Sequence, residues 1–200
     1  MKLFKWFQSK FYSDKNIVIE ELRKEIDRLK KENEINKSKI IKFQSDFCKE
    51  NIKVEFYDKN IEDKILKNIS NAKEEICIAV AWVTYYKYID AIEKLIERGV
   101  KVRIIIDDNK ENREGKEFNK LNDICSGLKI VKIYSDDINK KRIMHNKYCI
   151  IDNDKVIDGS YNWSFNAKFN EEHIVIINSH AVAKMFKKNF DRIYNSYNNS

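Results

Sequence analysis

Residues 144–162 read M-H-N-K-Y-C-I-I-D-N-D-K-V-I-D-G-S-Y-N, and most predictions for this chain rest on this stretch. Its apolar middle predicts a buried strand over residues 143–151. Side chains at positions i and i+2 of a strand point to the same face, so His145 and Lys147 are expected to project side by side. That arrangement places a nitrogen nucleophile beside a fixed positive charge.

A second short strand is predicted over residues 155–158, followed by a tight turn at Gly159 and Ser160. The hairpin formed by the two strands would return Ser160 and Asn162 to the neighbourhood of His145. A cation, a hydroxyl, an amide and an imidazole that converge on one place can bind a phosphoryl group.

The spacing H-x-K-x4-D-x6-G-S-x-N resembles the signature of the phospholipase D superfamily. The following segment, N-W-S-F-N-A-K-F-N-E-E-H-I-V-I-I at residues 162–177, resembles the small members that carry a single motif, the bacterial nuclease and the mitochondrial cardiolipin hydrolase. Residues 54–57, 72–82 and 95–108 fit the same frame. The resemblance therefore covers roughly residues 52–195.

The resemblance implies metal-independent hydrolysis of a phosphodiester through a covalent phosphohistidine. In one subunit His145 would be the nucleophile. A second, protonated imidazole would donate to the leaving oxygen and then activate water. The other histidines, His173 and His180, lack the lysine and Gly-Ser partners. The resemblance therefore implies a homodimer in which His145 of both chains serves one site.

The same resemblance implies roles for the polar residues around the histidine. Lys147 would neutralise the non-bridging phosphate oxygens, and Ser160 and Asn162 would add hydrogen bonds. An acidic residue directly before the next strand would accept from the other ring nitrogen of the histidine and fix its tautomer. Glu172 aligns with that acid, and Glu171 is its competitor.

Two motif positions are expected to be structural. Asp152 matches the aspartate of the signature, and Gly159 belongs to the predicted turn. Just before the motif, the basic cluster of Lys140, Lys141 and Arg142 could line the entrance and hold a nucleic-acid backbone. The alternative is a solvated loop.

Neither a metal nor a cofactor is predicted. The nearest carboxylates, Asp107, Asp108 and Asp152, do not form a tight cluster on the motif strands. The chain has no G-x-G-x-x-G and no G-x-x-x-x-G-K-[ST], so nucleotide cofactors have no support. Its four cysteines include no C-x-x-C pair, which favours reduced thiols, a cytoplasmic location and small core residues at Cys77 and Cys149.

Charge and length limit the function classes. Two hundred residues suit one domain plus an appendage, and the formal net charge of +7 suits a polyanionic partner such as nucleic acid or an anionic membrane surface. The alternative is that the charges solvate helix faces. Trp82 and Trp163 are expected in the core or in a pocket wall rather than on a base-stacking platform.

Three regions are predicted along the chain. Residues 1–13 are aromatic and basic. Residues 1–12 are either a short peripheral membrane anchor or a segment that docks on the domain or starts the next helix. Residues 14–50 form a long helix that begins at Ser13 or Asp14, with a heptad repeat of apolar residues that predicts either a parallel dimeric coiled coil or a single amphipathic helix lying on the catalytic domain. Residues 51–200 form that domain.

Strands and helices alternate in the catalytic region, which predicts an α/β domain with a mixed sheet between helices. The predicted strands cover residues 52–57, 75–82, 100–107, 129–134, 143–151, 155–158 and 173–177. The predicted helices cover residues 61–71, 86–98, 112–126 and 179–194.

Three functions are compatible with these features. The first is a homodimeric endonuclease that cleaves DNA, RNA or both. The second is a membrane-associated phospholipase D or cardiolipin hydrolase, supported by the aromatic-basic N-terminus. The third is a non-catalytic nucleic-acid-binding or scaffold module, against which the intact motif speaks.

Overall fold

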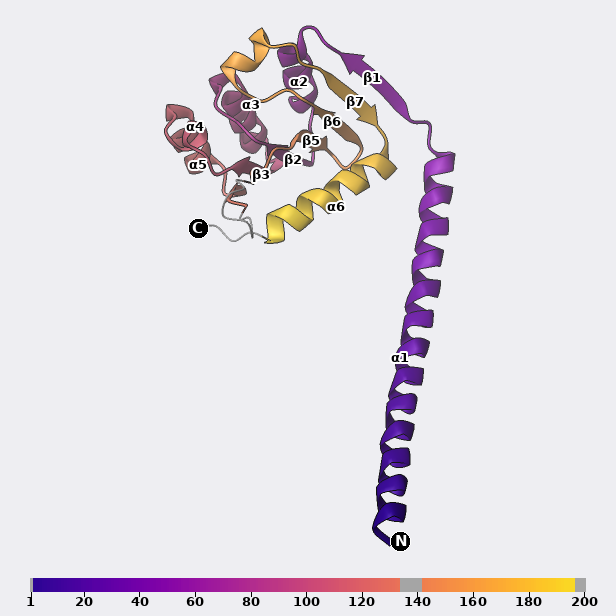
Figure 1. Ribbon diagram of the computed structural model, residues 1–200. Coiled ribbons are helices and arrows are strands. Elements are labelled where there is room, and N and C mark those ends of the chain that lie inside the picture. The colour runs from indigo at the N-terminus through magenta and orange to yellow at the C-terminus, as the bar shows by residue number, and fades with distance from the viewer. Residues whose placement is uncertain (1, 134–141, 197–200) are drawn as a thin grey trace. The chain divides into compact units, whose positions relative to one another are not determined.

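The computed structural model describes residues 2–133 and 142–196, without the side chains of residues 2–17, 43 and 46–49. The chain divides into two compact units, residues 1–49 and 50–200. The first unit is the long helix α1 (Lys2–Lys49), and the second contains the sheet and the remaining helices (Figure 1).

Helix α1 begins well before the predicted start. It runs without interruption through Ser13 and Asp14, so the prediction of an N-cap at either residue is wrong. Its predicted apolar row is exposed in the single chain, with exposed fractions of 57% for Leu22 and 50% for Leu29. Ion pairs such as Arg28 with Glu25 stabilise the polar faces of the helix. The coiled coil stays a prediction.

The second unit is built on a seven-stranded sheet. Its strands are β1 (Lys53–Tyr57), β2 (Glu75–Val80), β3 (Lys101–Asp107), β4 (Leu128–Val131), β5 (Lys147–Ile151), β6 (Lys155–Gly159) and β7 (Ile174–Asn178). Its helices are α2 (Ile61–Ile69), α3 (Tyr86–Glu97), α4 (Lys110–Arg113), α5 (Lys116–Ile124), the 3-10 helix η1 (Phe165–Phe169) and α6 (His180–Ser196).

The strand order is β1-β7-β6-β5-β2-β3-β4. Strands β2, β3 and β4 are parallel to one another, and the other neighbours are antiparallel. Parallel strands are covered on both faces, which explains the nearly continuous apolar run of β3. The predicted mixed sheet flanked by helices is confirmed.

Helices cover both faces of the sheet (Figure 1). One face packs against α2, α3 and α5 through fully buried residues such as Ile65, Ile92 and Leu121. The other face packs against α6 through Phe190 and Ile193. Cys77 and Cys149 are buried free thiols in this core, as predicted.

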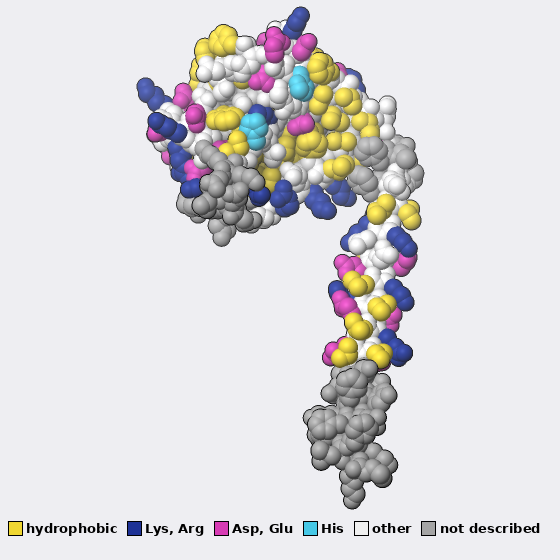
Figure 2. Space-filling model, in the orientation of Figure 1, with side chains coloured by type: hydrophobic (Ala, Val, Ile, Leu, Met, Phe, Trp, Pro, Cys, Tyr) yellow, Lys and Arg dark blue, Asp and Glu magenta, His cyan; other side chains and the backbone are white. Residues whose placement is uncertain are grey.

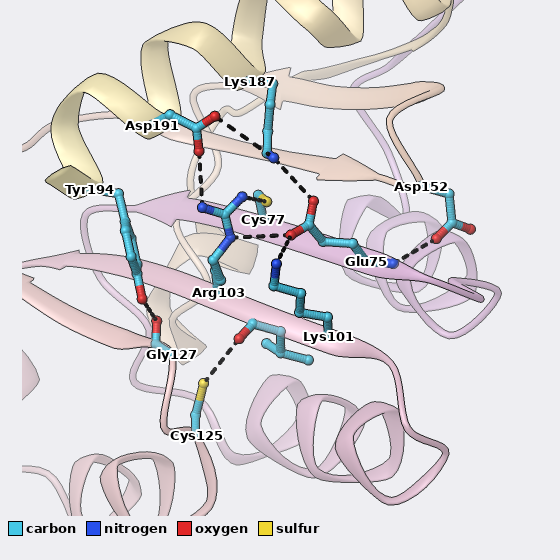
Figure 3. Close-up of polar contacts among 11 residues, drawn as sticks. Glu75, Cys77, Lys101, Arg103, Cys125, Gly127, Asp152, Lys187, Asp191 and Tyr194 are labelled. Carbon is cyan, nitrogen blue, oxygen red and sulfur yellow. Dashed lines mark hydrogen bonds and ion pairs between the residues drawn. The ribbon is translucent and has the colours of Figure 1, made fainter.

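A polar network holds α6 to one end of the sheet (Figure 3). The guanidinium of Arg103 on β3 donates to Glu75 of β2 at 3.2 Å and to Asp191 of α6 at 2.9 Å. Lys187 of α6 lies 3.1 Å from the same glutamate. These contacts lie at the amino-terminal ends of β2 and β3, the end of these strands opposite to the candidate site.

Several predicted boundaries are wrong for local reasons. The segment predicted as one helix over 112–126 belongs to two helices. Asn109 caps α4, which ends at Arg113, and α5 begins after its own N-cap, Gly115. The strand predicted over 143–151 begins only at Lys147. The strand predicted over 129–134 ends at Val131 within the described residues.

Asp152 stabilises the fold by binding the backbone at the start of β2. It lies in the turn between β5 and β6 with a φ of 51°, a left-handed conformation that Asp and Asn tolerate. Its carboxylate accepts the backbone N–H groups of Lys73 (3.0 Å), Glu74 (2.8 Å) and Glu75 (3.1 Å). The motif aspartate therefore fixes the start of β2 against the turn that follows β5.

Gly159 is required by a close approach between strands. A Cβ atom at this position would lie 2.2 Å from the backbone oxygen of His173. Gly159 is the last residue of β6 and pairs with Ile174 of β7, so the tight turn predicted at Gly159 and Ser160 is wrong. Only glycine lets the two strands lie this close.

Replacing Asp152 with alanine is expected to lower the free energy of unfolding by about 2 kcal/mol, because three backbone donors lose a charged acceptor. Urea denaturation measures the loss. Asp154 is the matched control, since it lies in the same turn with a side chain that is 53% exposed. Asp154→Ala should change stability by less than about 0.5 kcal/mol. Equal losses in the two variants would contradict this role of Asp152.

Candidate active site

His145 lies where β2 and β3 end, in a segment without regular secondary structure. The backbone oxygen of Asn146 accepts from the N–H of Ala81 at 2.9 Å, which continues the pairing of β5 with β2. The N–H of Met144 donates to Asp107 at the end of β3, at 2.8 Å. Ligand sites of α/β sheets commonly lie at these carboxyl ends of strands.

The side chains of His145 and Lys147 both lie against Trp82. The imidazole meets the indole edge to face, with ring centroids 5.6 Å apart and an interplanar angle of 89°. The ammonium of Lys147 lies 5.5 Å from the centroid of the same indole and donates to the backbone oxygen of His145 at 2.9 Å. Trp82 is half-buried and contacts both side chains, and its place in a pocket wall stays a prediction.

Burial and charge favour a neutral imidazole. The pKa of His145 is lowered because partial desolvation disfavours the imidazolium and because Lys147 repels it, while Asp107 acts in the opposite direction. The pKa of Lys147 is also lowered by burial, and the negative charge of Glu172 opposes that shift. A neutral imidazole beside a lysine has a free electron pair for attack on phosphorus.

Asn162 comes directly before Trp163, whose backbone binds that of Trp82. Trp163 is buried in the core, and its N–H donates to the backbone oxygen of Trp82 at 3.0 Å. The side-chain oxygen of Asn162 is buried and has no hydrogen-bond partner among the described residues. Buried polar atoms are rarely left unpaired. This oxygen only accepts hydrogen bonds, so the amide nitrogen is the group of Asn162 that can donate to an anion.

Ser160 is held between β6 and β7 rather than in a free turn. Its N–H donates to the backbone oxygen of His173 at 3.1 Å, and its hydroxyl oxygen accepts the N–H of His173 at 3.2 Å. The hydroxyl donates to the carboxylate of Glu172. Asn170 donates to the other oxygen of that carboxylate at 3.3 Å.

The predicted bond from Glu172 to the ring of His145 does not form in the single chain. Within residues 2–133 and 142–196, neither ring nitrogen of His145 has a hydrogen-bond partner, and Glu172 instead binds Ser160 and Asn170. The competitor Glu171 is exposed. The carboxylate whose charge acts on the imidazole is Asp107, which the sequence suggested only as one of three scattered acids.

The other histidines lie elsewhere. His173, directly before β7, stacks on Phe56 with ring centroids 5.8 Å apart. His180 is the first residue of α6, and its Nδ1 lies 3.1 Å from the backbone oxygen of Asn153. Neither ring lies against Trp82 in the part of the chain that the structure describes.

The basic cluster before the motif is described only in part. Lys140 and Lys141 lie outside the described residues, and Arg142 is exposed. Whether this cluster lines the entrance stays a prediction.

Carboxylates do not gather into a metal site among the described residues. Asp107 binds Met144, Asp108 pairs with Arg113, and Asp152 clamps the start of β2.

A cavity of about 270 Å³ opens beside the site and shares Glu172 with it. Its wall also includes Tyr161, Lys168 and the acidic residues Asp58, Glu62 and Asp63. The cavity offers room for a group attached to a phosphodiester held at Lys147.

Comparisons with known proteins identify the family of this chain. The family described as cardiolipin synthase, PLD-like domain, matches residues 65–194. A phospholipase D of Rickettsia conorii is 35% identical over 127 residues, which cover 63% of this chain and 60% of the relative. A mitochondrial cardiolipin hydrolase of Chlamydomonas reinhardtii is 24% identical over 135 residues, 67% of this chain and 57% of the relative. The chain thus spans less than two thirds of the length of these two relatives.

Two solved structures cover nearly the whole catalytic unit. NucT from Helicobacter pylori has a TM-score of 0.65 and 26% identity, over 73% of this chain and 98% of that one. Nuc from Salmonella typhimurium, a phospholipase D family member, has a TM-score of 0.60 and 25% identity, over 75% and 97%. Since the family match covers more than half of the chain and the fold agrees, the protein belongs to the phospholipase D-like family.

Proposed function

We propose that the protein is a homodimeric phosphodiesterase that cleaves nucleic acid through a phosphohistidine at His145, without a metal ion. The observation that carries the proposal is the pair of side chains on Trp82, a partly desolvated imidazole and a lysine beside it. Asn162 comes directly before Trp163, whose N–H binds the backbone of Trp82. The family includes relatives named for phosphodiester hydrolysis, which supports the reaction class.

In the first step, a ring nitrogen of His145 attacks phosphorus and the bond from phosphorus to the leaving oxygen breaks. A protonated imidazole donates its proton to that oxygen. In the second step the same imidazole, now neutral, takes a proton from water, and the hydroxide displaces His145 from phosphorus. Lys147 and Asn162 bind the non-bridging oxygens, where negative charge is concentrated in both transition states.

The proton donor has to come from outside the single chain described here. His173 stacks on Phe56, and His180 binds the backbone at Asn153, so neither is placed for this role. A second copy related by a two-fold axis would supply its own His145. Such a partner could also bring a carboxylate to the ring nitrogens, which the described residues of one chain do not do.

An exposed apolar surface supports the pairing of two copies. Val54 and Phe56 on the edge strand β1 are 58% and 62% exposed, and they pair with the apolar residues Ile177 and Val175 of β7. Figure 2 shows hydrophobic side chains gathered over this part of the sheet, beside α6. Exposed apolar patches of this kind are typical of association surfaces.

Charge favours nucleic acid as the substrate. Lys184, Lys188 and Arg192 follow one another at four-residue spacing on α6, are exposed, and form no ion pair among the described residues. Figure 2 shows basic side chains in a row along α6 next to the apolar surface. Together with the net charge of +7, this row suits a phosphate backbone. The structural neighbours NucT and Nuc, nucleases by name, support the same substrate.

The second candidate is a lipid phosphodiesterase, favoured by the relatives named cardiolipin hydrolase and phospholipase D. Among the described residues, no helix has both the length and the apolarity needed to cross a membrane. For lipid cleavage by peripheral contact, residues 1–12 are the proposed anchor. The cytoplasm is the proposed location in either case.

His145→Ala should reduce phosphodiester hydrolysis by about 10⁴-fold or more, because the nucleophile is lost. Hydrolysis by the wild-type protein should persist in EDTA. Assays in EDTA with single-stranded DNA, duplex DNA, RNA and cardiolipin side by side identify the substrate. His180→Ala is the control and should retain activity. Cleavage that stops when EDTA is added would count against the metal-free reaction.

Mixed dimers test whether two imidazoles serve one site. When wild-type and His145→Ala chains are mixed equally and allowed to exchange, activity should fall to about one quarter, because only wild-type pairs carry both imidazoles. Independent sites would instead leave about one half. Separating the mixed dimer with two affinity tags and assaying it directly distinguishes the two results, since the shared site predicts an inactive mixed dimer.

Removing residues 1–12 separates membrane attachment from catalysis. The shortened protein should lose binding to anionic liposomes, measured by co-sedimentation, while its hydrolysis of nucleic acid stays within about twofold of the full chain. Unchanged liposome binding would rule out this segment as the anchor.

A further inference from the structure

Asp107 is a buried acid at the end of β3, with an exposed fraction of 3%. One carboxylate oxygen accepts the N–H of Met144 at 2.8 Å, and the other accepts the side-chain amide of Asn109 at 2.9 Å. Met144 directly precedes His145, and its own side chain is 1% exposed. A buried charge is therefore bonded to the backbone next to the proposed nucleophile.

A buried asparagine, Asn112, connects the end of β3 with the segment around Trp82. The side-chain amide of Asn112 donates to the backbone oxygens of Ala81 (2.7 Å) and Asp107 (2.8 Å), and its oxygen accepts the N–H of Val83 at 3.1 Å. The backbone on both sides of Trp82 is thereby joined to the end of β3. Asp107 and the indole that contacts His145 thus belong to one hydrogen-bonded unit.

We propose that Asp107 positions His145: its buried carboxylate anchors the backbone at Met144, outside any strand, and so holds the imidazole against Trp82. The inference rests on the proposed function for the chemistry of His145. Asp107 itself does not touch the phosphodiester, because both of its oxygens are bonded within the protein. It acts through the histidine.

The negative charge of Asp107 has a second effect on the histidine. Among the described residues, the charged groups that act on the imidazole are Lys147 from β5 and Asp107 from β3. Burial and Lys147 lower the pKa of His145, and Asp107 limits that lowering. Each His145 has to be neutral as the nucleophile and protonated as the acid, so a fixed negative charge nearby supports the acid form.

Two substitutions separate these effects. Asp107→Ala removes the acceptor of the Met144 N–H, and kcat should fall about 100-fold because the imidazole is misplaced. Asp107→Asn keeps an oxygen acceptor and removes only the charge. At its own pH optimum, Asp107→Asn should recover most of the wild-type rate. The pH profile of its kcat/KM should move to lower pH, because the acidic and basic limbs of that profile both report the titration of imidazole groups. The matched control is Asp108→Asn, because that carboxylate pairs with Arg113.

NMR titration of the imidazole resonances provides a readout that needs no substrate. The pKa of His145 should be lower in Asp107→Asn than in wild type and unchanged in Asp108→Asn. An unchanged His145 pKa and an unchanged pH optimum in Asp107→Asn would overturn the charge effect. Equal activity of Asp107→Ala and wild type would overturn the positioning.

Hydrogen exchange in the wild-type protein covers the case in which a variant does not fold. The Met144 amide should be strongly protected, although it lies outside any strand, because its acceptor is buried. Exchange at the rate of a free loop amide would overturn the anchor. A folded protein with the predicted titration and protection but no hydrolysis of any phosphodiester would instead contradict the proposed function alone.

Discussion

The antiparallel pairing of β5 with β2 is the constraint on which the candidate site depends. It sets Lys147 opposite Val80 and continues through Asn146 and Ala81. A slip by one residue would exchange the two faces of β5. Burial opposes that slip, since Tyr148 packs against Phe186 of α6 while Cys149 joins the core on the other face. The hydrophobic core thereby determines where the residues just before β5 lie.

The site combines groups with opposing requirements. Desolvation and the neighbouring lysine lower the pKa of His145, which keeps more of the imidazole in the neutral form that can attack. The same desolvation makes protonation harder, and the buried charge of Asp107 counteracts this. The side-chain oxygen of Asn162 is buried without a hydrogen-bond partner among the described residues, which has a net cost. Preorganised cations such as Lys147 are expected where negative charge develops during a reaction.

Much of the fold was predictable because apolar periodicity is a local property of the sequence. The alternation of strands and helices, the helix predicted over 86–98 and the burial of β3 follow from it. The boundaries that failed depend on contacts between distant residues. Asn112 was expected to begin one long helix, but it lies in the short helix α4, where its side chain binds Ala81 and Val83. Ser160 was expected in a turn, yet it remains bonded to the residue before β7.

The candidate site was predictable only as far as its motif reaches. Spacing brought His145, Lys147 and Asn162 together, because each lies on or beside the same few strands. It did not reveal that Glu172 would bind Ser160, or that Asp107 would anchor Met144, since both contacts join separate segments. An aspartate at the carboxyl end of a buried strand was the available signal for the second contact.

The central claim is that His145 forms a covalent bond to phosphorus. The most direct measurement is to quench the reaction of the dimer with a radiolabelled phosphodiester and to locate the label by peptide mass spectrometry under alkaline conditions, which preserve phosphohistidine. The account predicts label on His145 that disappears when fresh unlabelled substrate and water complete the turnover. Label on any other side chain, or turnover with no labelled protein at any time, would contradict it.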